Sequence, residues 1–200
     1  MAVPNAIPPE QAVERLTEMG FFKYLPNSEQ DIARRELVAS LTQGYLGTEW
    51  NEDCVSRDKR AYPADSEELA EGRVGEFIQL MRDVLNREGV LFDSIEEDFQ
   101  DEAYAVVIDG QRHLIHDAST LGTWGSWTIS TKRLLEIVNG LLGQAGSSEK
   151  LYGIYGGNDG RAIFLTDEMY KFVSSCGLIS DHRETPYPAS AVKTDGTIDW

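Results

Sequence analysis

Cysteine is scarce in this chain, which has only Cys54 and Cys176 among its 200 residues. The two lie far apart and outside any CxxC pattern, so the sequence predicts no disulfide framework and no cysteine-based metal motif. Reduced thiols in a cytoplasmic protein are the simpler interpretation, although a single disulfide stays open. The first residues hold no basic stretch followed by an apolar one, so we expect no secretory signal. Apolar runs all fall well short of the roughly 20 residues of a membrane helix, so we expect no membrane contact.

Basic side chains are also few. The chain has 18 Lys and Arg against 34 Asp and Glu, which gives a net charge of −16. Binding of a phosphate backbone relies on Lys and Arg to release counterions, so this balance argues against direct contact with nucleic acid. A strongly acidic protein instead meets basic partners faster.

Catalytic motifs are missing as well. The glycine-rich stretch at 156–160 lacks the lysine of a phosphate-binding loop and leads into a strand pattern, so ordinary turn chemistry explains it. Cys54 with His182 could form a nucleophile and base, but their surroundings match no known signature. We therefore expect no cofactor and favour a protein that is not an enzyme.

The apolar pattern nevertheless predicts a well-built fold. Apolar residues at helical spacing predict helices that begin near Pro9, Ser28, Ser66, Ser130 and Thr166, while strands are predicted at 90–95, 104–108, 112–116, 151–156 and 161–165. Two hairpins without regular βαβ alternation favour an α+β fold, with a mainly antiparallel sheet of about four to six strands, helices packed on it, and an N-terminal helical hairpin. We expect one domain over residues 1–178, in which residues 8–46 could form a helical subdomain. Residues 179–200 are predicted to be an extended tail.

Several details follow from these patterns. The second helix is expected to start at a capping box of Ser28 and Asp31 and the third to run unbroken to Gly89, while Gly140 and Gly143 should fray the end of the fourth. A short strand is expected around Cys54. The buried face of the second helix is predicted to contain Ile32, Leu37, Val38, Leu41 and Tyr45.

The densest charge lies between residues 88 and 111. This window has no Lys or Arg, and its eight carboxylates hold half of the net charge: Glu88, Asp93, Glu96, Glu97, Asp98, Asp101, Glu102 and Asp109. Three interpretations are open, namely a solvated face, a cation site and a docking surface for a basic protein. A plain solubility face would mix Lys and Arg among the acids to limit repulsion, so this density keeps docking open on equal terms with simple solvation. Glu67, Glu68 and Glu71, early in the third helix, could extend the same surface.

Two further groups are candidates for function. His113, His116 and Asp117 have the residue types of a metal site, but alternation along a strand would place His113 and Asp117 on one side and His116 on the other. A small metal-dependent hydrolase built on these three and Asp53 is the alternative to a binding protein. Trp124 and Trp127 could anchor a partner, or they could fill the open end of the core.

The segment GIYGGNDGRAIFLT, residues 153–166, is a glycine-rich hairpin that enters a capped final helix. Together with the small size, the acidity and the missing active-site motifs, it resembles bacterial immunity proteins that neutralise toxins. The resemblance implies a non-enzymatic inhibitor that covers the substrate cleft of a basic toxin, often a nuclease. The predicted partner surface consists of Asp93, Glu96, Glu97, Asp98, Asp101, Glu102, Glu67, Glu68, Glu71, Trp124 and Trp127. An acidic mimic of nucleic acid is a further alternative.

Overall fold

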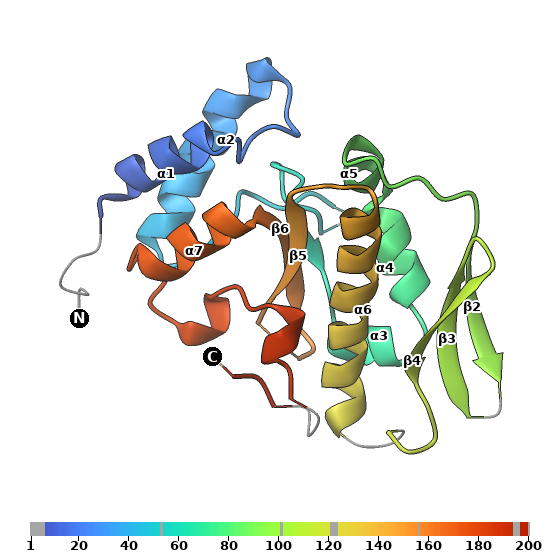
Figure 1. The fold of residues 1–200 in the computed structure, drawn as a ribbon. Coiled ribbons are helices and arrows are strands. Elements are labelled where there is room, and N and C mark those ends of the chain that lie inside the picture. Colours follow the sequence, from blue (N-terminus) through green and yellow to red (C-terminus); the bar gives the residue numbers. More distant parts are fainter. Residues whose placement is uncertain are drawn as a thin grey trace.

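The computed structural model describes residues 7–199 apart from 53, 101, 121–123, 156 and 194–196. In that part of the chain seven α-helices and two three-stranded antiparallel sheets form an α+β fold (Figure 1). The α+β class is therefore confirmed. The expectation of a single sheet of four to six strands is wrong, because the strands divide into two groups on either side of a long helix.

The helices are α1 (Pro9–Glu18), α2 (Asn27–Thr42), α3 (Ser66–Ala70), α4 (Val74–Leu80), α5 (Arg82–Arg87), α6 (Trp124–Gln144) and α7 (Asp167–Ser175). The first sheet has the order β1–β6–β5, with β1 (Ala61–Pro63), β5 (Glu149–Ile154) and β6 (Arg161–Thr166). The second has the order β2–β3–β4, with β2 (Ile95–Gln100), β3 (Ala103–Ile108) and β4 (Gln111–His116). Short 3₁₀ turns follow at His182–Glu184 and Ala189–Ala191.

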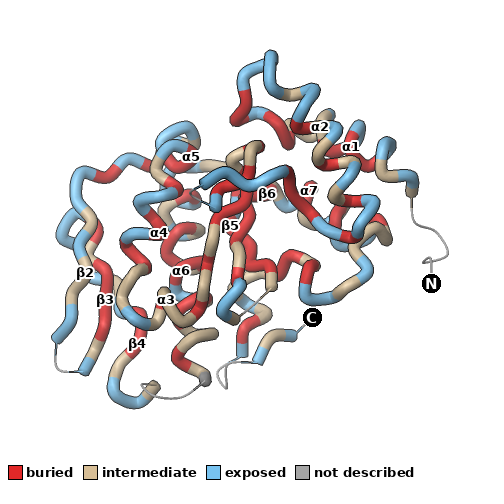
Figure 2. The backbone as a smooth tube through the Cα atoms, turned by 180° about the vertical axis from the view of Figure 1, so that it is seen from behind, coloured by how far each residue is buried: buried red, intermediate tan, exposed pale blue. Residues whose placement is uncertain are grey.

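Helix α6 lies between the two sheets and joins them into one core (Figure 1). Its fully buried stripe belongs to a cluster that reaches from Phe164 of β6 to Val106 of β3. Figure 2 shows the buried residues following β3, β5 and β6 and the inward side of the helices. The helix continues past Gly140 and Gly143, contrary to the sequence prediction, because its stripe stays in the core. That stripe consists of Leu134, Leu135, Val138 and Leu142.

The other face of the first sheet is covered by α1, α2 and α7. Tyr152 and Leu165 of this sheet share a second buried cluster with Leu16 of α1 and Leu37 of α2. The sheet is thus buried on both faces, which suits its apolar strands. None of the helices in the described ranges is long and apolar enough to cross a membrane.

The predicted buried face of α2 is wrong in part. Its buried residues are Ala33, Leu37 and Leu41, which follow each other at intervals of four. Ile32 therefore points away from the core, and Tyr45 lies beyond the end of the helix, so both are exposed. The predicted capping box is also wrong, since no side chain caps α2.

The predicted single helix over 66–88 consists of three pieces. Gly72 has φ +111°, a conformation that an α-helix cannot contain, and it separates α3 from α4. The chain turns again at Met81. The apolar residues at helical spacing from 70 to 85 predict one buried face. Ala70 is only partly buried, and the others are buried as predicted: Val74, Phe77, Ile78, Met81, Val84 and Leu85.

The β3–β4 hairpin turns at Asp109 and Gly110, with φ values of 48° and 80°. These positive values are those of a type I′ turn, for which the sequence Asp-Gly is typical. Strand β3, which is apolar on both faces, is the central strand of its sheet. Strand β2 starts at Ile95 and not at Val90, so the acidic residues 96–98 lie within a strand. The strand expected around Cys54 lies instead at Ala61–Pro63. Both cysteine thiols are free.

The chain after α7 returns to the first sheet. The N–H of Tyr187 donates to the carbonyl of Gly153 (2.8 Å), and the N–H of Gly153 donates to that of Tyr187 (2.9 Å). The Tyr155 N–H donates to the Arg183 carbonyl in the same way (2.8 Å). The segment around Tyr187 thus extends the sheet beside β5, and Tyr187 and Val192 are buried.

Candidate functional site

The acidic strand β2 lies at an edge of its sheet, against α4, and its side chains alternate between two environments. Glu97 faces the helix: its Oε1 accepts from the N–H of Gly75 (2.8 Å) and its Oε2 from the hydroxyl of Tyr104 (2.6 Å). Burial raises the pKa of Glu97 above its usual value, and these hydrogen bonds act in the opposite direction. Glu97 thus ties β2 to the first turn of α4, which is a structural role.

Three other carboxylates in and beside this strand have partners within the fold. Asp98 accepts from Nε of Arg112 on β4 (2.7 Å). Oδ1 of Asp109 accepts from the N–H groups of Asp93 and Ser94 and closes the loop before β2. Glu88 bonds Lys23, Tyr24 and Ser147. Four of the eight carboxylates in the window 88–111 therefore have partners within the fold: Glu88 and Asp98 in ion pairs, and Glu97 and Asp109 in hydrogen bonds.

The remaining acids point into solvent. Asp93, Glu96 and Glu102 of this region and Glu71 after α3 are exposed, and none of them forms an ion pair with a described residue. Asp101 lies outside the described residues. Of the α3 acids, Glu68 pairs with Arg73 (2.5 Å) and Glu67 accepts from the amide of Asn158 (3.0 Å).

The fold gathers these segments at one end of the molecule. The Phe99 ring of β2 lies so close to Gly72 that a Cβ there would overlap it, and Gly75 meets Glu97. Residues 65–102, which form α3, α4, α5 and β2, have thirteen acidic and three basic side chains, a net −10 out of −16. We call this region the acidic end. It also carries three exposed apolar side chains, Leu80, Leu91 and Phe99.

The histidines do not form a joint site. A bulge shifts the register at Tyr104, so that His113 lies opposite Val106 and His116 opposite Tyr104. His113 and His116 consequently share the helix-facing side, and the prediction that they point to opposite sides is wrong. Nε2 of His116 lies 2.9 Å from the Ala70 carbonyl, while the Asp117 carboxylate binds Ser119.

No group of three or more His, Cys, Asp or Glu in the described ranges could hold a metal ion. Asp53 of the alternative set lies outside those ranges. Trp127 is half-buried in the first turn of α6, and the side chain of Trp124 lies outside the described part. The structure therefore does not unite the histidines and Asp117 in one site, and of the predicted partner surface it leaves Asp93, Glu96, Glu102 and Glu71 exposed.

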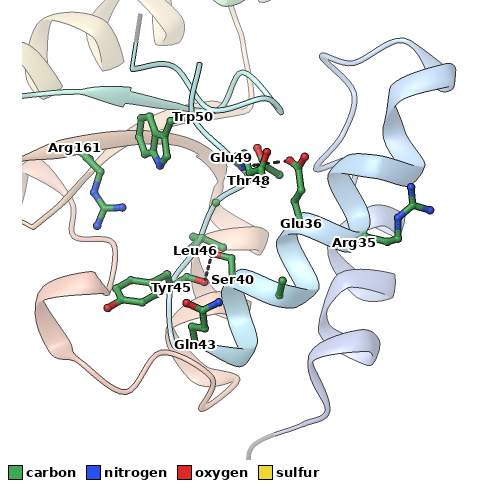
Figure 3. Close-up of a pocket in the computed structure, with 12 residues that line it drawn as sticks. Arg35, Glu36, Ser40, Gln43, Tyr45, Leu46, Thr48, Glu49, Trp50 and Arg161 are labelled. Carbon is green, nitrogen blue, oxygen red and sulfur yellow. Dashed lines mark hydrogen bonds between the residues drawn. The ribbon is translucent and has the colours of Figure 1, made fainter. Parts of the chain in front are cut away.

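A groove of about 480 Å³ beside α2 was not predicted (Figure 3). Tyr45 and Trp50 line it together with Arg35 and Arg161, and the Arg161 guanidinium lies 5.9 Å from the Trp50 ring. Tyr45 was assigned to the core from the apolar pattern, as was Ile32 near the other end of α2. The buried stripe of α2 consists of Ala33, Leu37 and Leu41. Ile32 lies beside this stripe and Tyr45 beyond its end, which is the one sequence signal that both face outward.

A buried ion pair was also missed. Arg60 and Glu149 are fully buried and bond through Nη1 and Oε2 (2.8 Å). Arg60 also donates to the carbonyls of Gly20, Phe21 and Phe164, and its guanidinium lies over the ring of Tyr24 (4.9 Å). The pair fixes the N-terminal helices to the first sheet, so its role is structural.

Comparison of the chain with known protein families, with curated proteins and with solved structures finds no match.

Proposed function

We propose that this protein is a non-enzymatic inhibitor of the immunity-protein type, which binds a basic protein through its acidic end. The observation that carries the proposal is the concentration of net −10 in residues 65–102, within which α4 and Gly72 pack against β2. Residues before and after this segment contribute −3 each. Such an uneven distribution steers a cationic partner toward one face.

Exposed apolar side chains support docking over simple solvation. Phe99 is 61% exposed and Leu91 77% exposed, and both stand among exposed carboxylates. Protein interfaces combine apolar anchors with a charged rim, whereas a face that only solubilises needs no exposed aromatic ring.

The contacts refine the set of residues that would meet the partner. Glu97, Asp98 and Glu68 already have partners in the fold, so their replacement would disturb the molecule itself. Glu71, Asp93, Glu96 and Glu102 are exposed and without ion pairs in the described part. These four form the testable docking set.

The test compares two variants of equal charge. One replaces the docking set by Gln or Asn. The control replaces four exposed acids elsewhere: Glu10, Glu14, Glu29 and Glu168. The partner is obtained by co-purification with the wild-type chain from its source cells, identified by mass spectrometry and purified. Association rates are then measured between about 50 and 500 mM NaCl.

We expect a basic partner, a wild-type rate that falls steeply with salt, and a docking-set variant that associates at least about tenfold more slowly than the control at low salt. Inhibition of the partner's toxicity by the wild type, and weaker inhibition by the docking-set variant, completes the test. A partner that binds both variants at equal, salt-independent rates would rule out the acidic end.

A further inference from the structure

Strand β4 leaves one backbone edge of its sheet open. It pairs with β3 on one side only, and no backbone group of residues 111–116 bonds another described segment. Antiparallel pairing uses alternate residues, so every second residue of β4 turns its N–H and C=O to the open side. The complement of such a row of groups is an extended chain.

A groove runs along this edge, between β4 and α6. Two contiguous depressions of about 330 and 390 Å³ share Leu114, Arg133 and Glu136. On the helix they follow one stripe from Ile129 to Gln144, which spans roughly 22 Å at the rise of an α-helix. The six residues of β4 span about 20 Å, so the groove suits a segment of six or seven extended residues.

The other sheet provides an internal precedent. There the segment around Tyr187 lies along the edge of β5 and forms a pair of backbone hydrogen bonds with Gly153. One strand edge beside α6 is thus already filled by an extended segment of the chain, while the β4 edge is open.

The side chains of the groove indicate what kind of segment fits. Ile137 and Leu141 line its floor, and burial lowers the pKa of His113 there, which favours the neutral ring. Lys132, Arg133 and Lys193 gather at the end nearest Thr120, against Glu136 and Asp117. Lys132 donates to the Val192 carbonyl and has no carboxylate partner among the described residues. Arg133 pairs with Glu136 and Lys193 with Asp199, so Lys132 is the cation that is left to attract an acidic side chain in this groove.

We propose that the groove between β4 and α6 binds an extended segment of a partner protein, with alternating apolar and acidic side chains, which joins the sheet as a strand beside β4. Its apolar side chains face α6, and an acidic side chain reaches Lys132. This site is separate from the acidic end and does not depend on the function proposed above.

The test uses a blocked seven-residue peptide of alternating Glu and Val, titrated into the ¹⁵N-labelled chain. We expect saturable amide shifts confined to residues 111–117 and 129–144. A peptide with Lys in place of Glu should bind at least fivefold more weakly. A Glu-Val peptide with N-methyl groups on all of its residues, which cannot donate to the β4 edge in either strand direction, should not bind.

Two glycines of α6 give matched variants. Gly140 lines the groove and Gly143 does not, and a Cβ on either would meet no other atom. Glutamine at either position should keep or raise the melting temperature, because glycine weakens a helix interior. We expect Gly140→Gln to weaken the binding of the Glu-Val peptide at least tenfold, and Gly143→Gln to change its dissociation constant less than twofold.

The proposal is overturned if the Glu-Val peptide gives no saturable shift at 1 mM, if the shifts lie on β2, or if both glycine variants bind alike. Equal binding of the N-methylated peptide would also overturn it, because it would show that the strand edge is not used.

Discussion

The buried ion pair of Arg60 and Glu149 should contribute strongly to the free energy of unfolding. Neither side chain is exposed, and each is the other's partner. Replacing one member of a buried pair leaves the second charge without compensation, which costs about 3–5 kcal/mol. Arg60 keeps its bonds to three carbonyls, so we expect the lower end of that range.

Glu149→Gln should thus reduce the free energy of unfolding by about 3 kcal/mol, measured by urea denaturation. Glu136→Gln is the control, because Glu136 forms a partly exposed pair with Arg133 and should change stability by less than about 1 kcal/mol. Equal effects of the two variants would contradict the role of the buried pair.

Asp58 is the residue whose titration should be visible in stability. It is fully buried, and burial raises its pKa in the folded state, although hydrogen bonds from Ser56 and Arg60 oppose the shift. Its Oδ2 has no hydrogen-bond partner among the described residues. A raised folded pKa means that its contribution to stability is fully present below the unfolded value of about 4 and is lost as pH rises through the folded value.

The Asp58→Asn variant removes this titration and keeps an acceptor for Ser56 and Arg60. We expect the difference in unfolding free energy, variant minus wild type, to increase as pH rises from 4 to 8. Chemical denaturation at four or five pH values measures it. A difference that stays constant over this range would show that Asp58 does not titrate as the structure indicates.

Among the elements, glycine separates α3 from α4 but lies within α6 without interrupting it. Gly72 ends α3 with a positive φ and meets the Phe99 ring, whereas Gly140 lies inside α6 with open space around it. Gly72→Ala should therefore destabilise the protein by more than 1 kcal/mol, and Gly140→Ala should stabilise it by about 0.5–1 kcal/mol. Melting temperatures would show opposite shifts, and a shift of the same sign would refute this reading of the helix breaks.

The sequence predicts the elements better than their ends. Apolar spacing identifies the buried residues of 74–85 correctly, because burial of that face is retained across the breaks. It does not reveal the break at Gly72, because that conformation is set by the contact with Phe99, 27 positions away in the chain. The β3–β4 turn at Asp109 is predictable, since two adjacent residues determine it.

At the scale of the whole molecule, the net charge of −16 should make stability depend on salt. Mutual repulsion of the carboxylates opposes compact folding, and added ions screen it. We expect the unfolding free energy to rise between about 20 and 300 mM NaCl. The docking-set variant should show a smaller rise than the four-acid control, because it removes charge where it is densest.

Urea denaturation at three salt concentrations measures the effect in all three proteins. A rise of equal size in both variants would mean that the acidic end is no more crowded than the rest of the surface.

The division into two sheets could not be predicted from the pattern. Strand signals give the hairpins, but they do not show that α6 stands between β5 and β4. The sequence shows the run of charge at 88–111, but it does not show that β2 packs against α4, because the contacts of Phe99 with Gly72 and of Glu97 with Gly75 are tertiary. The sequence also does not predict that Glu97 bonds Tyr104 and that Asp98 pairs with Arg112, because these contacts depend on the strand register and not on the spacing of residues in the chain.

The bonds between Tyr187 and Gly153 have a consequence for biosynthesis. Residues 183–187 leave the ribosome after β5 and β6 have been made, so the outer edge of β5 stays unpaired in a nascent chain until these residues have been synthesised. An unpaired strand edge can form backbone hydrogen bonds with other chains and so promote aggregation. Messages truncated before codon 183 should therefore yield products that depend on chaperones or form inclusion bodies.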